Sequence, residues 1–188
     1  MISVTALAPG PLADTRTTVE DPTMIPETAM QAIVLSALSG VLVFAALTDA
    51  RRLVIPNRVS LAVLGLFPLW LAVAPTAFLP QLLPAALTGI AVLALGFLLF
   101  AGGLLGGGDV KLLAALAVWA GPDRIVALIV VTVLAGGALA AFCLIGLAWK
   151  RVVGPVGGAA ASVWREPLPY GCAVAVGGID LVLRHLPA

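Results

Sequence analysis

Charged residues are scarce in this sequence. Only 10% of its 188 residues are Asp, Glu, Lys or Arg, whereas 62% are hydrophobic, and the mean hydropathy is +1.17. Soluble domains carry about 25% charged residues, and a chain of this size could not bury so much apolar surface. The composition therefore excludes a water-soluble enzyme, a nucleic-acid-binding protein and a disordered chain. It predicts an integral membrane protein that contacts the lipid bilayer.

Cysteine and histidine are nearly absent as well. The two cysteines, Cys143 and Cys172, lie in apolar stretches without a Cys-x-x-Cys pattern, so small buried hydrophobic side chains are their simplest interpretation. The single histidine, His185, follows Arg184 at the end of the last apolar run, as an interfacial residue would. We expect neither a metal ion nor a cofactor.

Long uncharged runs dominate the rest of the chain. They predict an all-α membrane bundle of about six transmembrane helices, one of them short. Residues 29–188 form this membrane domain, and the polar, proline-containing residues 1–28 are expected to be a disordered tail. Proline breaks a helix, and glycine favours a loop or an unwound segment, expected here at Gly102–Gly108. The predicted helices are Thr28–Thr48, Ser60–Ala74, Pro84–Ala101, Asp109–Ala120, Ile125–Trp149 and Leu168–Leu183.

The short helix Asp109–Ala120 is only ~18 Å long and could either cross the membrane or re-enter it. Arginines follow the first span, which places that loop in the cytoplasm. If the short helix crosses, the later basic residues also fall inside; if it re-enters, they fall outside. We therefore favour six crossings with both termini outside. The basic residues concerned are Arg51, Arg52, Arg58, Lys150, Arg151 and Arg165.

Five acidic residues follow the tail, and three of them have a basic neighbour. We expect Asp123 to pair with Arg124, Glu166 with Arg165, and Asp180 with Arg184 one helical turn later. The other two acids are Asp49, at the end of the first span, and Asp109, at the start of the short helix. Six crossings bring both to the cytoplasmic boundary.

Two carboxylates at one depth can share a proton, so that one activates water as a base and the other protonates a carbonyl. Helix dipoles assign the negative charge to Asp109, at a helix N-terminus, and the shared proton to Asp49, at a helix C-terminus. The structural alternatives are that Asp109 caps its helix and that Asp49 pairs with Arg51 or Arg52.

Two motifs surround these acids: Asp49-Ala-Arg-Arg-Leu-Val-Ile-Pro-Asn57 and Gly106-Gly-Gly-Asp-Val-Lys-Leu112. Together they resemble the type IV prepilin peptidases, membrane aspartic peptidases with a Gly-x-Gly-Asp motif. The run Pro167-Leu-Pro-Tyr-Gly171 is similar to the short members associated with tight-adherence (Flp) pili. The chain lacks the paired cysteine motifs of the larger, bifunctional members, so the resemblance implies peptidase but not methyltransferase activity.

The resemblance implies Asp49 and Asp109 as catalytic residues in a bacterial inner-membrane protein, with the active site facing the cytoplasm. The expected partners are prepilins or pseudopilins with a hydrophobic N-terminal helix, together with pilus or secretion machinery. Gly106 and Gly108 either expose backbone groups to the substrate or allow helices to approach closely.

The remaining motif residues are expected to shape the site. Ile55, Pro56 and Asn57 would form an extended break followed by an N-cap for the second span. Lys111 would either influence the electrostatics of the site or reach toward lipid phosphates.

A transporter or channel component in which the same two acids relay protons or bind a cation is the alternative function. Its acids should lie near the middle of the membrane, whereas these are expected at one boundary.

Overall fold

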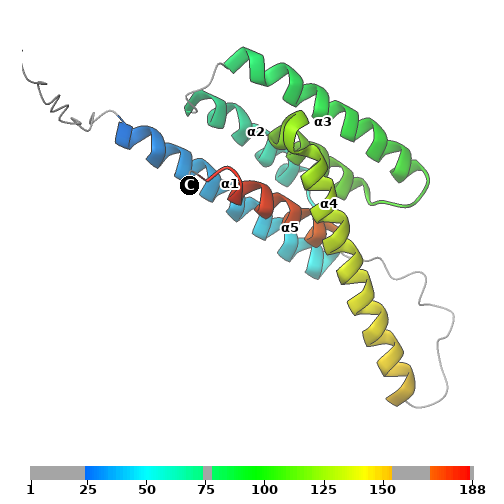
Figure 1. Cartoon of the computed structure of the whole chain (residues 1–188). Coiled ribbons are helices and arrows are strands. Elements are labelled where there is room, and N and C mark those ends of the chain that lie inside the picture. The colour runs from blue at the N-terminus through cyan, green and yellow to red at the C-terminus, as the bar shows by residue number, and fades with distance from the viewer. Residues whose placement is uncertain (1–23, 74–77, 154–169, 187–188) are drawn as a thin grey trace, which may run out of the picture.

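The computed structural model describes residues 24–73, 78–153 and 170–186, which are helical with short connections and contain no strand (Figure 1). This confirms the all-α bundle. Three helices, α1, α3 and α4, are long and apolar enough to cross a membrane, and α2 and α5 are shorter apolar helices. The helices are α1 (Met24–Arg52), α2 (Asn57–Val73), α3 (Phe78–Ala101), α4 (Gly107–Val153) and α5 (Tyr170–Leu183).

Helix α4 consists of two segments, 107–120 and 122–153, that meet at a sharp kink. Gly121 has φ 57° and ψ −174°, a conformation that only glycine adopts without strain, and Pro122 cannot donate the next helical hydrogen bond. The sequence Gly121-Pro122 therefore separates the short helix from the long one, as predicted. With this kink, the described residues contain six helical segments.

Most of the described helix ends gather at two ends of the bundle. At one end, which we call the acid end, α1 and α3 stop and α2, α4 and α5 begin. At the other, the kink end, the end of α2 and the start of α3 lie with Gly121 and His185 around one cavity. The 107–120 segment thus runs from the acid end of the bundle to the kink end.

Small residues let the helices pack closely around 107–120. A side chain at Gly89 or Gly96 of α3 would collide with Val118 or Val110 of α4. Gly178 of α5 would likewise meet side chains of α1 and α4. Without a hydrophobic driving force between helices in lipid, such close backbone approach is a main source of packing energy. The largest fully buried side chains belong to one core cluster: Leu35, Leu38, Leu42, Val63, Leu112, Leu116, Leu128 and Leu181.

The outer surface of the bundle is apolar. Phe97, Leu98 and Leu134, for example, expose 61%, 66% and 67% of their surface. Soluble proteins rarely expose large contiguous apolar patches, whereas a lipid-facing helix does so along its length. The chain is a membrane protein, as its composition indicated.

Several helix boundaries differ from those predicted. α1 begins at Met24, so residues 24–28 of the expected tail are helical, whereas residues 1–23 lie outside the described part. α3 begins at Phe78 rather than Pro84, because Pro80 is tolerated in a first turn and the chain continues helically through Pro84. α4 begins at Gly107, so the predicted loop Gly102–Gly108 is two residues too long.

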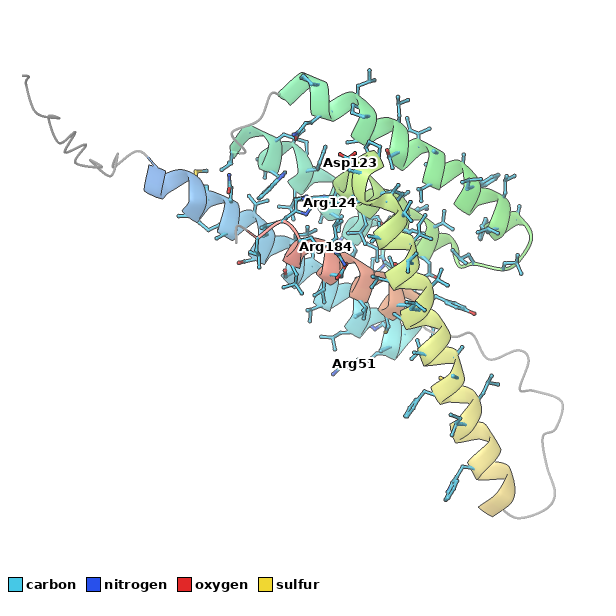
Figure 2. The ribbon with its side chains drawn as sticks, viewed as in Figure 1. Arg51, Asp123, Arg124 and Arg184 are labelled. Carbon is cyan, nitrogen blue, oxygen red and sulfur yellow. The ribbon has the colours of Figure 1, made fainter. Side chains whose placement is uncertain are left out.

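The charged pairs are only partly as expected. Asp180 and Arg184 form the predicted ion pair, with 2.7 Å between Oδ2 and Nε. Glu166 and Arg165 lie outside the described residues. Asp123 and Arg124 lie at the kink end, opposite Arg51 at the end of α1, and form no recorded ion pair in the described part of the chain (Figure 2).

Candidate active site

A cavity of about 450 Å³ lies at the acid end, and both remaining aspartates line it. Asp49 is only 4% exposed and Asp109 8%, which makes them, with Ser60, the buried polar residues of the described chain. Ile55, Tyr170 and the segment 103–108 complete most of the wall. The two carboxylates are close enough for their charges to interact. The structure thus brings together residues that are 60 positions apart in the sequence.

Asp49 lies in the last turn of α1 and is held by the start of α5. Its Oδ2 accepts a hydrogen bond of 3.2 Å from the backbone N–H of Cys172, and the Gly171 N–H donates to the same carboxylate. No ion pair with Arg51 or Arg52, the alternative considered above, is recorded in the described residues, and both arginines are exposed. A carboxylate at a helix N-terminus binds where free N–H groups and the helix dipole favour negative charge.

Gly171 is essential to this contact. A Cβ atom there would lie 2.8 Å from the Asp49 carboxyl carbon and 2.5 Å from Cδ1 of Ile55, so any other residue would displace one of them. Leu53, with φ 52°, ends α1 in a left-handed conformation, and its N–H donates to the Asp49 carbonyl. The chain therefore turns away directly after Asp49 and leaves the carboxylate facing the cavity.

Asp109 is the third residue of α4. The Gly106 carbonyl accepts the first helical hydrogen bond, from Val110, so Gly106 is the N-cap residue. The Asp109 carboxylate folds back to accept the Gly106 N–H, as the acidic residue of a capping box does. Asp109 therefore does cap its helix, as the structural alternative held, while it also lines the cavity.

Gly106, Gly107 and Gly108, at the start of α4, have different roles. A Cβ at Gly106 would lie 2.7 Å from the Asp109 carboxylate, and one at Gly108 would lie 3.1 Å from the Ile55 Cβ. Gly108 thus allows α4 to approach the chain at Ile55, which is the close-approach interpretation. The N–H groups of Gly107 and Gly108, in the first turn of α4, have no acceptor within the helix and border the cavity.

Ile55 is 6% exposed and packs against both Gly108 and Gly171, so it joins the starts of α4 and α5. The Pro56 carbonyl accepts the Val59 N–H, and α2 begins at Asn57, as the predicted break and helix start require. Pro56 and Asn57 thus direct the chain into α2.

Lys111 does not line the acid cavity. Its Nζ donates a hydrogen bond of 3.0 Å to Oδ1 of Asn57, and both side chains are exposed. This contact links the first turns of α2 and α4, a role that neither sequence-based interpretation of Lys111 included. In the described residues the Asn57 side chain makes this contact with α4, and no capping hydrogen bond from it is recorded.

The expected asymmetry between the two acids does not follow from helix dipoles. Asp49 ends α1, but it also receives the N-terminus of α5, whereas Asp109 lies at the N-terminus of α4. Both carboxylates are therefore at helix N-termini. The dipole argument that gave the proton to Asp49 counted only its own helix.

Sequence reasoning missed the contribution of α5 to the site. Tyr170 lines the acid cavity, and the N–H groups of Gly171 and Cys172 hold Asp49. The Cys172 side chain is half-buried rather than fully buried, and its Sγ contacts the Ala46 carbonyl at 3.4 Å, whereas its backbone N–H binds Asp49. The run that ends in Tyr170 and Gly171 was the available signal, but it did not indicate what its N–H groups bind.

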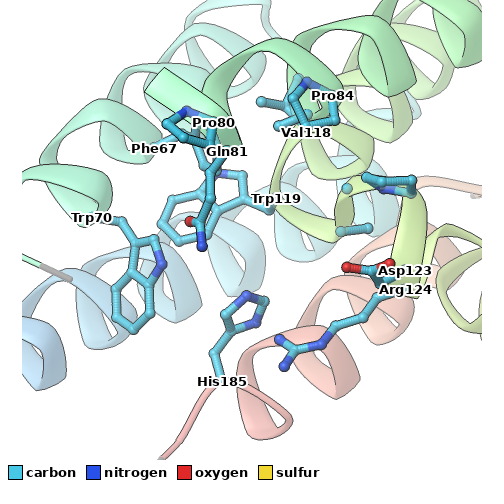
Figure 3. Close-up of a pocket in the computed structure, with 14 residues that line it drawn as sticks. Phe67, Trp70, Pro80, Gln81, Pro84, Val118, Trp119, Asp123, Arg124 and His185 are labelled. Atoms are coloured by element: carbon cyan, nitrogen blue, oxygen red, sulfur yellow. The ribbon is translucent and has the colours of Figure 1, made fainter. Parts of the chain in front are cut away.

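A second cavity, of about 550 Å³, lies at the kink end (Figure 3). Trp70 and Trp119 flank His185, with ring centroids 5.6 Å and 6.4 Å from the imidazole. The His185 Nδ1 lies 2.8 Å from the Leu181 carbonyl, and burial lowers the pKa of the imidazole. Asp123 and Arg124 also line this cavity. In the described residues neither cavity gathers three or more His, Cys, Asp or Glu side chains that could hold a metal.

Comparison with known protein families identifies one match. The model of the type IV leader peptidase family matches residues 36–144, more than half of the chain. This range includes Asp49, Asp109 and the segments around them, but not α5. Searches of curated proteins and of solved structures found no significant match. The chain belongs to the type IV leader peptidase family.

Proposed function

We propose that this protein is an aspartic endopeptidase in which Asp49 and Asp109 activate the water molecule that cleaves a peptide bond. The observation that carries the proposal is the pair of nearly inaccessible carboxylates in one cavity of an otherwise apolar bundle. Charged groups inside a membrane domain are costly and are usually retained for function. Both acids stand in the segments that match a peptidase family.

The proposed chemistry uses the two carboxylates as one unit. Like charges in a poorly solvated cavity cannot both ionise cheaply, so the pair holds one proton between them. The ionised carboxylate removes a proton from water, and the protonated one donates its proton to the carbonyl oxygen of the scissile peptide. Because both acids accept hydrogen bonds from helix N-termini, either can carry the negative charge.

We propose type IV, Flp-like prepilins or pseudopilins as the substrates, with cleavage of their short leader at the cytoplasmic boundary of the bacterial inner membrane. The free N–H groups of Gly107 and Gly108 support this, because a peptide bound in extended form beside Asp109 can hydrogen-bond to them. Arg51 lies at the same end of the bundle as the acids, which supports a cytoplasmic location under the positive-inside rule (Figure 2). Methyl transfer is not part of the proposal.

The position of the acids also favours a peptidase over a proton or cation transporter. Transporter sites lie near the middle of the bilayer, whereas Asp49 is in the last turn of α1 and Asp109 in the first turn of α4.

The test is co-expression of the protein with candidate prepilins, with leader removal read by mass spectrometry. Wild-type protein should remove the leader, and Asp49→Asn and Asp109→Asn should each lower the cleavage rate by about 10³-fold or more. The matched control is Asp123→Asn, which removes an acid from the kink end and should leave cleavage within about twofold of wild type.

Substantial cleavage by either Asp49→Asn or Asp109→Asn would refute the carboxylate pair. Proton flux through reconstituted vesicles, without any cleavage of prepilins, would refute the peptidase proposal and favour the transporter.

A further inference from the structure

An apolar groove of about 500 Å³ runs along the side of the bundle between α3, the second segment of α4 and α5. Its walls are formed by Val92, Leu95 and Leu99 of α3, Ile129 and Val133 of α4, and Val174 of α5. Leu95 and Val133 are 63% and 64% exposed, so they face the surroundings of the bundle rather than its core. The groove is therefore open to the membrane.

This groove leads to the candidate active site. Leu105, Asp109 and Tyr170 line both the groove and the acid cavity. Asp109, only 8% exposed, is thus the charged end of a mostly apolar groove, whose other polar side chains are those of Thr132 and Tyr170. A molecule lying in the groove would reach the Asp109 carboxylate without leaving the protein surface.

The shape of the groove suits a helix. The wall formed by the second segment of α4 consists of residues 129, 132, 133, 136, 137 and 140, which form one face over three helical turns, about 16 Å long. Small residues, Gly136, Gly137 and Ala140, form the part of this wall nearest Tyr170. Small residues on one helix allow the backbone of another to approach closely within a membrane.

We propose that this groove binds the hydrophobic helix of the substrate, with the N-terminal end of that helix at Asp109 and its C-terminal end toward Val92 and Ile129. The inference rests on the proposed function, because a leader that precedes an apolar helix places the scissile peptide at the N-terminus of that helix. The groove supplies apolar contact along the helix, and the cavity receives the peptide that precedes it.

A second apolar groove, of about 640 Å³, lies on the face formed by α2, α3 and the first segment of α4. It ends at Asn57 and Lys111 and contains neither aspartate. A helix bound there would not deliver its N-terminus to the acids. Of these two grooves, the one beside α5 is the one that contains an aspartate.

Gly137 provides a direct test. Gly137 lines the groove, and a Cβ at this position would meet no atom within 4 Å, so a side chain there begins in open space. Gly137→Leu should lower the rate of cleavage of a full-length prepilin about tenfold or more, because the side chain occupies the space of the substrate helix. Gly146→Leu is the matched control on the same helix, since a Cβ there also meets nothing and the residue does not line the groove. It should cleave at the wild-type rate.

Cross-linking supplies a measurement that does not depend on folding of the Gly137 variant. A photo-crosslinking amino acid placed at Val133 of the Asp109→Asn protein should capture the prepilin helix, whereas the same group at Leu61, in the second groove, should not. Capture at Leu61 but not Val133, or wild-type cleavage by Gly137→Leu, would overturn the proposal. Cross-links to lipid alone at both positions would also overturn it.

These outcomes are distinct from failure of the proposed function. If the protein is not a prepilin peptidase, wild type and Gly146→Leu will leave prepilins intact. If only the groove assignment is wrong, wild type and Gly137→Leu will cleave equally well.

Discussion

The two ends of the bundle carry cavities of similar size but opposite character. At the acid end, glycines and helix N-termini surround two buried carboxylates in a cavity of about 450 Å³. At the kink end, Trp70 and Trp119 each pack edge to face against His185 in a cavity of about 550 Å³, beside the charged residues Asp123 and Arg124 (Figure 3).

This difference distinguishes charged residues that can take part in a reaction from charged residues that lie at a solvated turn. A charge that is partly exposed at a turn, such as Arg124, can be solvated by water and headgroups. Asp49 and Asp109 are buried, and backbone N–H groups hold them in place. A buried acid that is positioned by helix ends rather than neutralised by a basic side chain remains available for a reaction. Four substitutions test this comparison, starting with the largest expected effect.

Gly171→Ala should strongly reduce activity. The new Cβ would lie 2.8 Å from the Asp49 carboxyl carbon and would push that carboxylate away from its position relative to Asp109. A displacement of about 1 Å at a catalytic group can lower the rate about 100-fold. Cleavage assays measure the effect, with Gly65→Ala as control because its Cβ meets nothing within 4 Å. Wild-type cleavage by Gly171→Ala would show that the contact of α5 with Asp49 is dispensable.

Gly121→Ala should affect stability instead. A non-glycine residue at φ 57° and ψ −174° is strained, at a cost of about 2 kcal/mol in the free energy of unfolding. The acid cavity lies at the other end of the bundle, so the cleavage rate of the folded protein should not change. Thermal unfolding in detergent and the cleavage assay measure the two effects separately. A large loss of activity at unchanged stability would contradict the separation of the two ends.

Lys111→Met should have a smaller effect at the acid end. It removes the exposed hydrogen bond to Asn57 that links α2 and α4, and this bond contributes about 1 kcal/mol or less to the free energy of unfolding. We expect a slightly lower thermal midpoint and cleavage within about threefold of wild type. A loss as large as that of Asp109→Asn would show that Lys111 acts in the reaction itself.

His185→Phe should change how stability depends on pH. Burial lowers the pKa of His185 in the folded protein below its ordinary value of 6.5, and Arg124 adds to this effect. Below that pH the unfolded chain binds a proton that the folded protein disfavours, so folding stability falls as the pH falls. The wild-type thermal midpoint should drop between about pH 7.5 and about pH 5.5, and His185→Phe should show a smaller drop. An equal drop in both proteins would assign the pH dependence to other groups.

Much of the fold was predictable because it depends on local composition. Apolar runs indicated the helices, and Gly121-Pro122 indicated the break in α4, since proline and glycine act on the backbone at their own position. Boundaries were less predictable. Pro80 and Pro84 predicted a later start for α3. The helix instead begins at Phe78, and it packs closely against α4 at Gly89.

The candidate site was predictable only as a pair of acids. Asp49 and Asp109 were conspicuous because almost all other charges had a place in a loop, an end or a local pair. The hydrogen-bond partners of Asp49 were not predictable, because Cys172 is 123 positions away and no local pattern encodes such a contact. The same limit explains why the dipole argument failed: it treated Asp49 as part of α1 alone.

The amino-acid sequence by itself determined that this protein is a helical membrane protein with two acids at one end, because hydropathy and charge are sums over neighbouring residues. Only the tertiary structure decided that α5 supplies the N–H groups that hold Asp49, that Lys111 binds Asn57, and that a groove leads to Asp109. These features depend on which helix ends meet in space, and that is set by the packing of Gly108, Gly171 and Ile55 across three helix termini.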